Sequence, residues 1–237
     1  MRILPYQSRR TGYRLPFFLR DSNEGRVRWR QRFSTTEAYK NSMRNYYALI
    51  TEVDGACKRI VDVLKQQGIL NETLIIFTTD NGSFHGEHGL AGKWYPYQES
   101  IIRDPRMPKS KRGQLDKSIT LNIDLASTIL GAAQLKPTSV MQGRDIADLY
   151  LSPTGRNTWR NEFYYEHMSM GKTYIPASSA LVRKDFKYIA YSEWDVEQLF
   201  DLKLDPHEER DLSNNTEFAG LMEAMRKRHD ELKRNVV

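Results

Sequence analysis

A short stretch in the first half of the chain gathers residues whose types can do chemistry. Asp80 and Asn81 stand side by side, and Lys93 follows after a glycine-rich loop. A carboxylate beside a carboxamide offers two hard oxygens, which suit Ca²⁺ or Mg²⁺ better than softer metal ions. Because Ca²⁺ takes roughly six to eight oxygens, other segments or a substrate must complete such a site. The lysine ammonium group suits an anionic group held by the metal.

The loop between these residues is built to turn tightly. Taken alone, the Asp-Asn-Gly triplet at residues 80–82 is more typical of an ordinary β-turn than of a metal site. Four glycines in this stretch indicate a tightly wound backbone, since glycine tolerates backbone conformations that other residues avoid. They are Gly82, Gly86, Gly89 and Gly92.

A long helix is expected before this stretch. Ser34 and Glu37 have the spacing of a capping box, in which each side chain satisfies a free backbone N–H at a helix start. Gly68 is typical of a helix end. Apolar residues recur between them at intervals of three and four, which places one apolar stripe on a helix. The stripe comprises Tyr46, Ile50, Val53, Cys57, Ile60, Val61 and Leu64.

Residues 74–79 are a continuous apolar and β-branched run that predicts a buried strand of the parallel type. This order of helix, short loop and buried strand is typical of an α/β sheet. In such sheets functional residues cluster beyond the carboxyl ends of the strands. Asp80 and Asn81 lie at such an end.

Later residues predict a smaller unit. A helix is expected over 123–135, strands over 163–167, 180–191 and 197–202, and an amphipathic helix over 217–233. The inward side chains of that last helix are predicted to be Phe218, Leu221, Met222, Met225 and Leu232. The predicted fold class is therefore α/β, with part of a mixed, mostly parallel sheet flanked by helices, and a small carboxyl-terminal antiparallel sheet plus a helix.

Three regions follow from this pattern. Residues 1–33 show no sustained period and are expected to form an irregular basic segment, 34–160 a partial α/β core with the Asp-Asn pair, and 161–237 an α+β subdomain.

Taken together, the motifs resemble the sulfatase family of the alkaline-phosphatase superfamily over about residues 26–235. Asp80-Asn81-Gly82, Gly86-Glu87-His88-Gly89 and Gly92-Lys93-Trp94 with Tyr97-Gln98-Glu99-Ser100 match the family's second signature region in order and spacing. Stretches that agree on either side are Tyr46–Ile50, Asn122–Ala126, Gly143–Asp145, Ala180–Arg183 and Glu197–Leu202.

The resemblance implies hydrolysis of a sulfate ester on a sulfated small molecule or a sulfated polysaccharide. It implies a Ca²⁺ ion held by two aspartates from an early strand together with Asp80 and Asn81, and it places Lys93 against the sulfate. The implied nucleophile is a formylglycine hydrate, made from the Cys or Ser of a Cys/Ser-x-Pro-x-Arg motif.

Histidines near the predicted site are candidate acids, because unperturbed histidine titrates near neutral pH. His88 matches the family motif as a candidate catalytic residue, and we expect it to position other groups rather than react. We expect His85 at the solvent rim and Glu87 as a loop-ordering acceptor rather than a metal ligand. His167 either faces the substrate pocket or is a structural histidine.

Essential parts of the family's site are absent from the chain. No proline has Cys or Ser two positions before it, and no two aspartates are adjacent. The single cysteine, Cys57, lies in a helical pattern, where we expect it to be a core residue. A core strand that the family carries after Ser100 is shortened here. The chain therefore resembles the carboxyl-terminal half of a sulfatase and is not expected to turn over substrate alone.

The amino-acid composition limits the classes of protein to which the chain can belong. The 237 residues, 39% hydrophobic and 28% charged, suit one globular domain, and no apolar run is long enough to span a membrane. The single cysteine excludes an internal disulfide. The net charge of +6 divides into +8 for residues 1–45 and −2 for the rest. Arginines and aromatics in 26–33 have the composition of a polyanion or nucleic-acid contact, but we favour a covering segment whose arginines pair with acids or lie in water.

Two rival functions remain. One is a non-catalytic pseudoenzyme that binds sulfated or polyanionic ligands, which salt-sensitive binding without hydrolysis would reveal. The other is a phosphoryl-transfer relative in the same superfamily, against which the Gly-Glu-His-Gly and Gly-Lys motifs argue.

Overall fold

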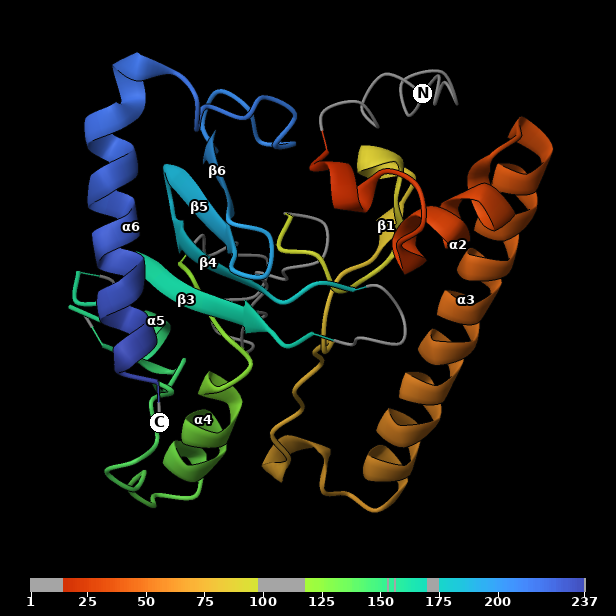
Figure 1. The fold of residues 1–237 in the computed structure, drawn as a ribbon. Coiled ribbons are helices and arrows are strands. Elements are labelled where there is room, and N and C mark those ends of the chain that lie inside the picture. The colour runs from red at the N-terminus through yellow and green to blue at the C-terminus, as the bar shows by residue number, and fades with distance from the viewer. Residues whose placement is uncertain (1–14, 98–117, 153, 156, 170–174, 237) are drawn as a thin grey trace.

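The computed structural model describes residues 15–97, 118–152, 154–155, 157–169 and 175–236. The shortened strand after Ser100 and the first fourteen residues of the basic segment lie outside these ranges. Figure 1 shows a long helix on one side of the molecule and a four-stranded sheet with a helix on the other. Among the described residues, no helix is long and apolar enough to cross a membrane.

The described helices and strands alternate irregularly along the chain. The helices are α2 (Glu24–Phe33), α3 (Thr36–Gln66), α4 (Asp124–Ala132), α5 (Asp148–Leu151) and α6 (Ala219–Arg234), with short 3₁₀ turns at Phe17–Leu19, Leu70–Glu72, Glu87–Gly89 and Thr216–Phe218. The strands are β1 (Phe84–His85), β2 (Ala91–Gly92), β3 (Glu162–His167), β4 (Ser178–Arg183), β5 (Phe186–Tyr191) and β6 (Val196–Asp201).

The amino-terminal segment is not irregular throughout, because it contains α2. Asn23 caps this helix by accepting a hydrogen bond from the Arg26 N–H at 3.0 Å. Trp29 and Phe33, four residues apart, are buried against Ala91 of β2. The prediction failed because this helix is stabilised by packing on a distant hairpin rather than by a long apolar period of its own.

The long helix α3 forms as predicted, with its start displaced by one residue. Thr35, not Ser34, is the cap, and its hydroxyl accepts from the Ala38 N–H at 3.1 Å. At the other end Gly68 adopts a φ of 74°, and the Ile69 N–H donates to the Leu64 carbonyl.

The apolar stripe of α3 belongs to none of the cores that the described residues form. None of its residues is buried, and Cys57 is only half-buried, so the predicted core role of that cysteine is wrong. Residues 74–79 pair with no other described strand, and their side chains are exposed. The predicted burial fails because no described strand lies beside this segment to pair with it.

The carboxyl-terminal unit confirms the predicted antiparallel sheet and helix. Its strand order is β3-β4-β5-β6, with pairs such as Phe163 opposite Val182. The run 180–191, predicted as one strand, is the hairpin of β4 and β5. The fold is therefore a mixed α/β fold in which the described sheets are antiparallel.

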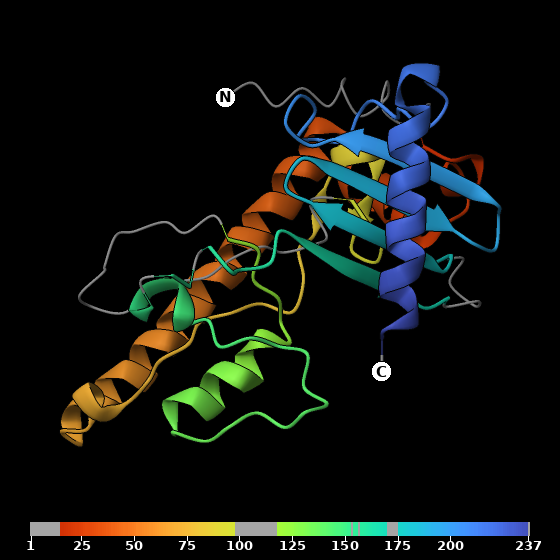
Figure 2. The same ribbon diagram turned by 90° about the vertical axis from the view of Figure 1, so that its left-hand side faces the viewer.

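Both faces of this sheet are covered. Figure 2 shows α6 lying across one face, where Met222 and Met225 are buried against Leu181, Tyr188 and Leu199. On the other face, the residues that lead into and out of the glycine-rich loop pack with the segment before α2. This second core includes Leu15, Leu19, Phe84, Tyr95, Tyr97, Val182, Ile189 and Phe200.

Candidate functional site

A two-stranded hairpin brings Lys93 back to the Asp-Asn pair. In it, β1 and β2 pair antiparallel, with Phe84 opposite Gly92. The Ser83 hydroxyl donates to the Gly92 carbonyl at 3.2 Å, which ties the start of the hairpin to its end. Lys93, the next residue, therefore lies beside Asn81 although eleven residues separate them in sequence.

Oxygens of Asp80 and Asn81 converge on the Lys93 ammonium group. Lys93 Nζ donates to Asn81 Oδ1 at 3.0 Å and lies 3.6 Å from Asp80 Oδ2. The backbone N–H of Asn81 donates to Asp80 Oδ1 at 2.9 Å, and Asn81 Nδ2 donates to the Gly82 carbonyl at 2.7 Å. These local bonds orient both side chains, so the three residues predicted for the site are brought together.

Positive φ angles shape the loop as its glycines predict. Gly86, Gly89 and Gly92 have φ values of 121°, 68° and 93°. A Cβ on Gly92 would lie 3.0 Å from the Trp94 ring, a closer approach than side chains normally make. Trp94 itself has a φ of 88°, a conformation that L residues rarely adopt. The backbone on both sides of Lys93 is therefore held in an unusual shape.

Arginines of α2 support this loop from outside. Arg26 Nη1 donates to the Gly89 carbonyl at 2.8 Å, and the Arg28 guanidinium lies 4.6 Å from the centroid of the Trp94 ring. Arg28 also pairs with Glu24 at 2.6 Å, and Arg30 lies 3.5 Å from Asp21. The basic run is thus engaged within the fold, as expected of a covering segment.

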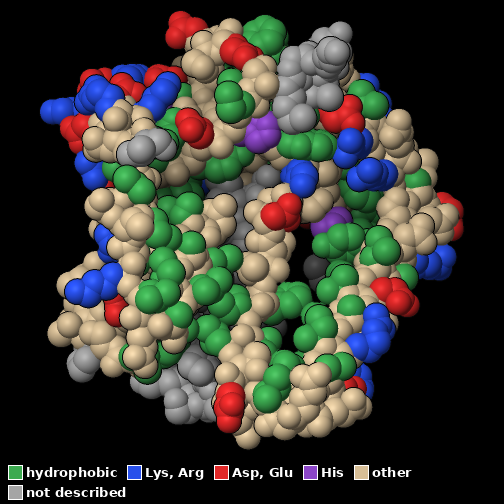
Figure 3. All heavy atoms as spheres, turned by 90° about the horizontal axis from the view of Figure 1, so that it is seen from below, with side chains coloured by type: hydrophobic (Ala, Val, Ile, Leu, Met, Phe, Trp, Pro, Cys, Tyr) green, Lys and Arg blue, Asp and Glu red, His purple; other side chains and the backbone are tan. Residues whose placement is uncertain are grey.

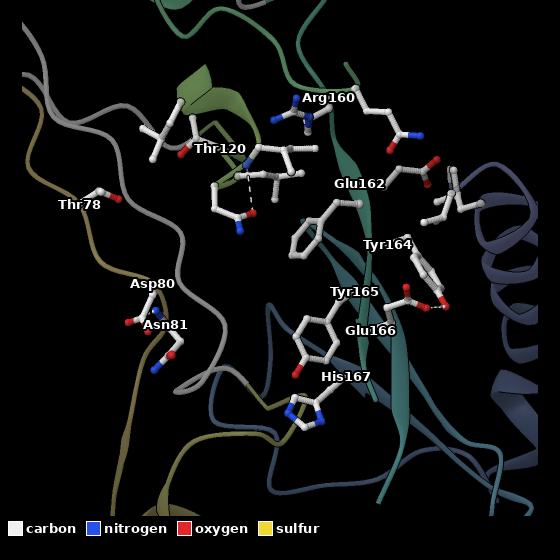
Figure 4. A pocket seen from close by; sticks show the side chains of 18 of the residues that line it. Thr78, Asp80, Asn81, Thr120, Arg160, Glu162, Tyr164, Tyr165, Glu166 and His167 are labelled. Carbon is white, nitrogen blue, oxygen red and sulfur yellow. Dashed lines mark hydrogen bonds between the residues drawn. The ribbon is translucent and has the colours of Figure 1, made fainter. Parts of the chain in front are cut away.

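The Asp-Asn pair and Lys93 border a cavity of about 830 Å³. In Figure 4, Asp80 and Asn81 lie on one side, and Tyr165 and His167 of β3 point toward them from the other. Tyr164 and Glu166 alternate with them and point the opposite way (Figure 4). Further lining residues are Thr78, Thr79, Trp94, Thr120, Leu121, Ile146 and Arg160.

The two β3 residues facing the Asp-Asn pair are uncharged near neutral pH. Burial raises the pKa of Tyr165 to about 12 and lowers the pKa of His167 below its ordinary value. His167 thus faces the cavity, as one of the two alternatives held. Tyr165 was missed, although the period of two along residues 163–167 gives it the same face as His167.

His88 does not line this cavity. Its ring is buried and stacks on the ring of Tyr97 with centroids 4.5 Å apart. The His88 ring therefore lies outside the cavity that Lys93 borders, and its positioning role stays a prediction. His85 is half-buried, and its ring lies 4.4 Å from that of the partly exposed Tyr46. Glu87 accepts from the His85 backbone N–H at 2.6 Å, as expected of a loop-ordering residue.

The donor atoms fit a hard cation in part. Asp80 and Asn81 direct two oxygens toward one positively charged group, and oxygens of these kinds are the ones that hard cations prefer. Within the part of the chain that the structure describes, no cluster of three or more His, Cys, Asp or Glu side chains could hold a metal ion. The pair is therefore suited to supply two ligands of a larger set.

Comparison with known families identifies the chain. Residues 86–235 match the family model described as N-sulphoglucosamine sulphohydrolase, C-terminal, and residues 21–135 match the Sulfatase model. The chain belongs to the sulfatase family. The matches confirm the resemblance inferred from the motifs around Asp80 and Lys93.

Curated relatives of this sulfatase-family chain extend well beyond it. It is 32% identical over 195 residues to an N-acetylglucosamine-6-O-sulfatase of Bacteroides thetaiotaomicron, covering 76% of the chain and 34% of that protein. It is 30% identical over 197 residues to an arylsulfatase of Clostridium perfringens, covering 81% of the chain and 40% of that protein. The chain thus spans well under half the length of these relatives.

Solved structures agree with this assignment. A protein solved in complex with its substrate D-glucosamine-2-N,6-O-disulfate superposes with a TM-score of 0.72 at 28% identity, over 84% of this chain and 42% of that one. A phosphonate monoester hydrolase of Agrobacterium radiobacter superposes with a TM-score of 0.70 at 22% identity, over 86% of this chain and 43% of that one. The second likeness shows that the fold is shared across chemistries.

Proposed function

We propose that this chain is the carboxyl-terminal part of a sulfuric ester hydrolase. In this proposal Lys93 contacts the sulfate group, and Asp80 and Asn81 are ligands of a Ca²⁺ ion. The observation that carries the proposal is the convergence of Asp80 Oδ2 and Asn81 Oδ1 on Lys93 Nζ beside the cavity. A sulfate ester bound there would contact a cation that is already held in position. An ordinary β-turn at residues 80–82 would not fix the position of the lysine.

The chain's own residues supply binding and orientation. Asn81 holds the Lys93 ammonium group, and the positive-φ residues on either side fix the backbone that carries it. A cation fixed in advance stabilises negative charge without having to reorganise during the reaction. The Ca²⁺ ion, when bound, would add a second positive charge against the sulfate oxygens.

Sulfated sugars are the proposed substrate class. The relatives support this class, since one is named as an N-acetylglucosamine-6-O-sulfatase and another was solved with a disulfated glucosamine. The cavity has room for a monosaccharide, and Tyr165 and His167 face Asp80 and Asn81 across it (Figure 4). An aromatic ring beside an imidazole suits the apolar face and hydroxyl groups of a sugar.

Turnover is not proposed for the 237-residue chain alone. It lacks a Cys/Ser-x-Pro-x-Arg motif and an adjacent aspartate pair. Incubation with 4-methylumbelliferyl sulfate and Ca²⁺ is therefore expected to release no fluorophore above the buffer rate. Hydrolysis by the purified chain that follows protein concentration would overturn this part of the proposal.

Binding tests the site itself. Titration calorimetry with glucosamine 6-sulfate in Ca²⁺ buffer, against glucosamine as the unsulfated control, is expected to show sulfate-dependent binding. Lys93→Ala should weaken it at least tenfold, whereas Lys184→Ala in the exposed β4–β5 turn should not. Equal affinity of both variants would contradict the role of Lys93. Salt-sensitive binding to heparin that both variants retain would instead favour the non-catalytic alternative.

A further inference from the structure

Lys93 stands between two residues whose backbones both adopt the left-handed conformation. Gly92 has a φ of 93° and Trp94 a φ of 88°. Glycine adopts such angles freely, whereas a bulky side chain at positive φ is strained and keeps that conformation only when its surroundings hold it. Strained backbone of this kind occurs mainly at functional sites. The conformation of Trp94 therefore needs a support, and the direction in which the Lys93 side chain leaves the backbone depends on that support.

The Trp94 ring packs on the backbone of Gly92 and on the guanidinium group of Arg28. A Cβ on Gly92 would lie 3.0 Å from Trp94 Cζ3 and 3.8 Å from Arg28 Cδ, so a side chain at position 92 would crowd the ring. Arg28 Cζ lies 4.6 Å from the centroid of the ring, within the range of a cation–π interaction. Arg28 therefore holds the ring in place, and the ring restrains the backbone that carries it.

Glu24 orients Arg28 toward the ring. The two residues are one helical turn apart on α2, and Arg28 Nε donates to Glu24 Oε1 at 2.6 Å. The arginine and glutamate side chains are 34% and 28% exposed, and a partly exposed ion pair contributes little to the stability of a fold. The pair therefore orients the guanidinium group more than it stabilises the helix, and a substitution of Arg28 should leave the chain folded.

Other contacts dock α2 on the hairpin without Arg28. The Tyr95 hydroxyl accepts from the Gly25 N–H at 2.8 Å, and Arg26 Nη1 donates to the Gly89 carbonyl at 2.8 Å. These two bonds join the helix to the chain before and after the segment that carries the lysine. A variant of Arg28 should therefore release the tryptophan ring while α2 stays in place.

We propose that Arg28 is a positioning residue, which fixes Lys93 through the ring of Trp94. While the ring is held, the backbone stays left-handed and the Lys93 ammonium group donates to Asn81 Oδ1 at 3.0 Å beside the cavity. When the ring is released, residue 94 can return to the ordinary negative φ region, and the lysine loses its direction. A cation held in advance binds an anion more tightly, since less side-chain freedom is lost on binding. The consequence for sulfate rests on the proposed function, whereas the position of the lysine does not.

The reactivity of the Lys93 amine tests its position without any ligand. The 237-residue chain is treated with a limiting amount of N-hydroxysuccinimidyl acetate, and peptide mass spectrometry gives the rate of acetylation of Lys93 relative to the exposed Lys184. Lys93 is 44% exposed but donates to Asn81, so loss of its restraint should raise the rate. Arg28→Met should raise the relative rate about threefold, the size expected of a partly exposed cation–π contact. Arg28→Lys keeps a cation beside the ring and should restore most of the slow rate.

Arg30→Met is the matched control, because Arg30 lies on the same helix and pairs with the exposed Asp21. It should leave the Lys93 rate unchanged, and all three variants should keep the urea midpoint of the unsubstituted chain. An unchanged Lys93 rate in Arg28→Met would overturn the proposal, and so would an Arg28→Lys variant that reacts like Arg28→Met. A large fall in the midpoint of Arg28→Met would make the role of the arginine purely structural, which would also overturn it.

Sulfate affinity measures the consequence for the site. The cavity opens on the hollowed face that Figure 3 shows from below. Titration calorimetry with glucosamine 6-sulfate in Ca²⁺ buffer should show about threefold weaker binding to Arg28→Met and near-normal binding to Arg28→Lys. Adding Arg28→Met to Lys93→Ala should cause no further loss, because the arginine acts through the lysine. Additive losses would show that Arg28 acts independently of Lys93 and would contradict the proposal.

The two measurements separate this inference from the proposed function. If the unsubstituted chain binds no sulfated sugar, the proposed function fails, while the acetylation rates still decide the role of Arg28. If binding depends on Lys93 but the Lys93 rate does not respond to Arg28→Met, the positioning inference fails and the proposed function stands.

Discussion

The guanidinium group of Arg160 forms a two-pronged ion pair with the carboxylate of Asp124 at the start of α4. Arg160 Nη2 lies 2.6 Å from Asp124 Oδ1, and Nη1 donates to Oδ2. Asp124 is completely buried, and it also accepts from the backbone N–H groups of Leu121 and Arg144 at 2.7 and 2.8 Å. The pair joins α4 to the residues before β3 and so fixes one wall of the cavity.

Removing the arginine should destabilise the fold strongly. Arg160→Leu leaves a buried carboxylate without its counter-ion, and a lost partner of this kind costs about 3–5 kcal/mol of unfolding free energy. Urea denaturation at pH 7 measures the loss. Arg30→Ala is the matched control, since Arg30 and Asp21 are largely exposed, and it should leave the midpoint nearly unchanged. A similar midpoint for both variants would contradict the structural role of the buried pair.

The buried Lys187–Glu208 pair should control the loop that carries Lys93. Both side chains are inaccessible to solvent, and Lys187 Nζ also donates to the Pro96 carbonyl at 3.1 Å. Lys187→Met should cost about 3–5 kcal/mol and raise amide exchange in residues 93–97. The double variant Lys187→Met with Glu208→Leu should recover most of the stability, since it removes both charges, but not the tether to Pro96. Unchanged exchange in 93–97 would show that the loop does not depend on this lysine.

Two adjacent hydroxyls should differ in their effect on α3. Thr35→Ala removes the hydroxyl that accepts from the Ala38 N–H, and losing such a cap typically costs about 1 kcal/mol. Ser34→Ala is the control, because Ser34 lies beside the cap and does not supply it. Thermal unfolding followed by circular dichroism at 222 nm compares the two. A larger loss for the Ser34 variant would move the helix start back to the residue predicted from sequence.

Acid should weaken the contact between α6 and the sheet. Arg226 donates to both Glu197 oxygens, at 2.8 and 2.6 Å, and this holds the pKa of Glu197 below its ordinary value of 4.5. Because the folded carboxyl binds its proton less readily than the unfolded one, the stability it provides is complete above pH 4.5 and is lost as pH falls through the lower folded pKa.

Glu197→Gln isolates this contribution. The variant should be less stable than the unsubstituted chain at pH 7, and the difference should shrink as pH falls below 4.5 in urea denaturation. A difference that stays constant as pH falls would assign the effect to packing rather than to ionisation. Glu193→Gln, in an exposed turn, serves as the control.

Local signals in the sequence determined much of the carboxyl-terminal unit and of the site loop. The apolar spacing of 217–233 gave the buried side of α6, including Met222 and Met225. The glycine-rich loop turned as expected at Gly86, Gly89 and Gly92, since glycine adopts positive φ angles without strain. These features succeed because their causes lie within a few residues.

Only the tertiary structure decided what each of these elements faces. Asn23 caps an α2 that no long period announces, His88 stacks on Tyr97 away from the cavity, and Lys93 reaches Asn81 through the pairing of β1 with β2. The apolar stripe around Val53 and the run at 74–79 carry the sequence of buried elements, yet both are exposed. A hydrophobic pattern specifies which side chains prefer burial, whereas burial itself requires an opposing surface, and that surface is a property of the assembled fold.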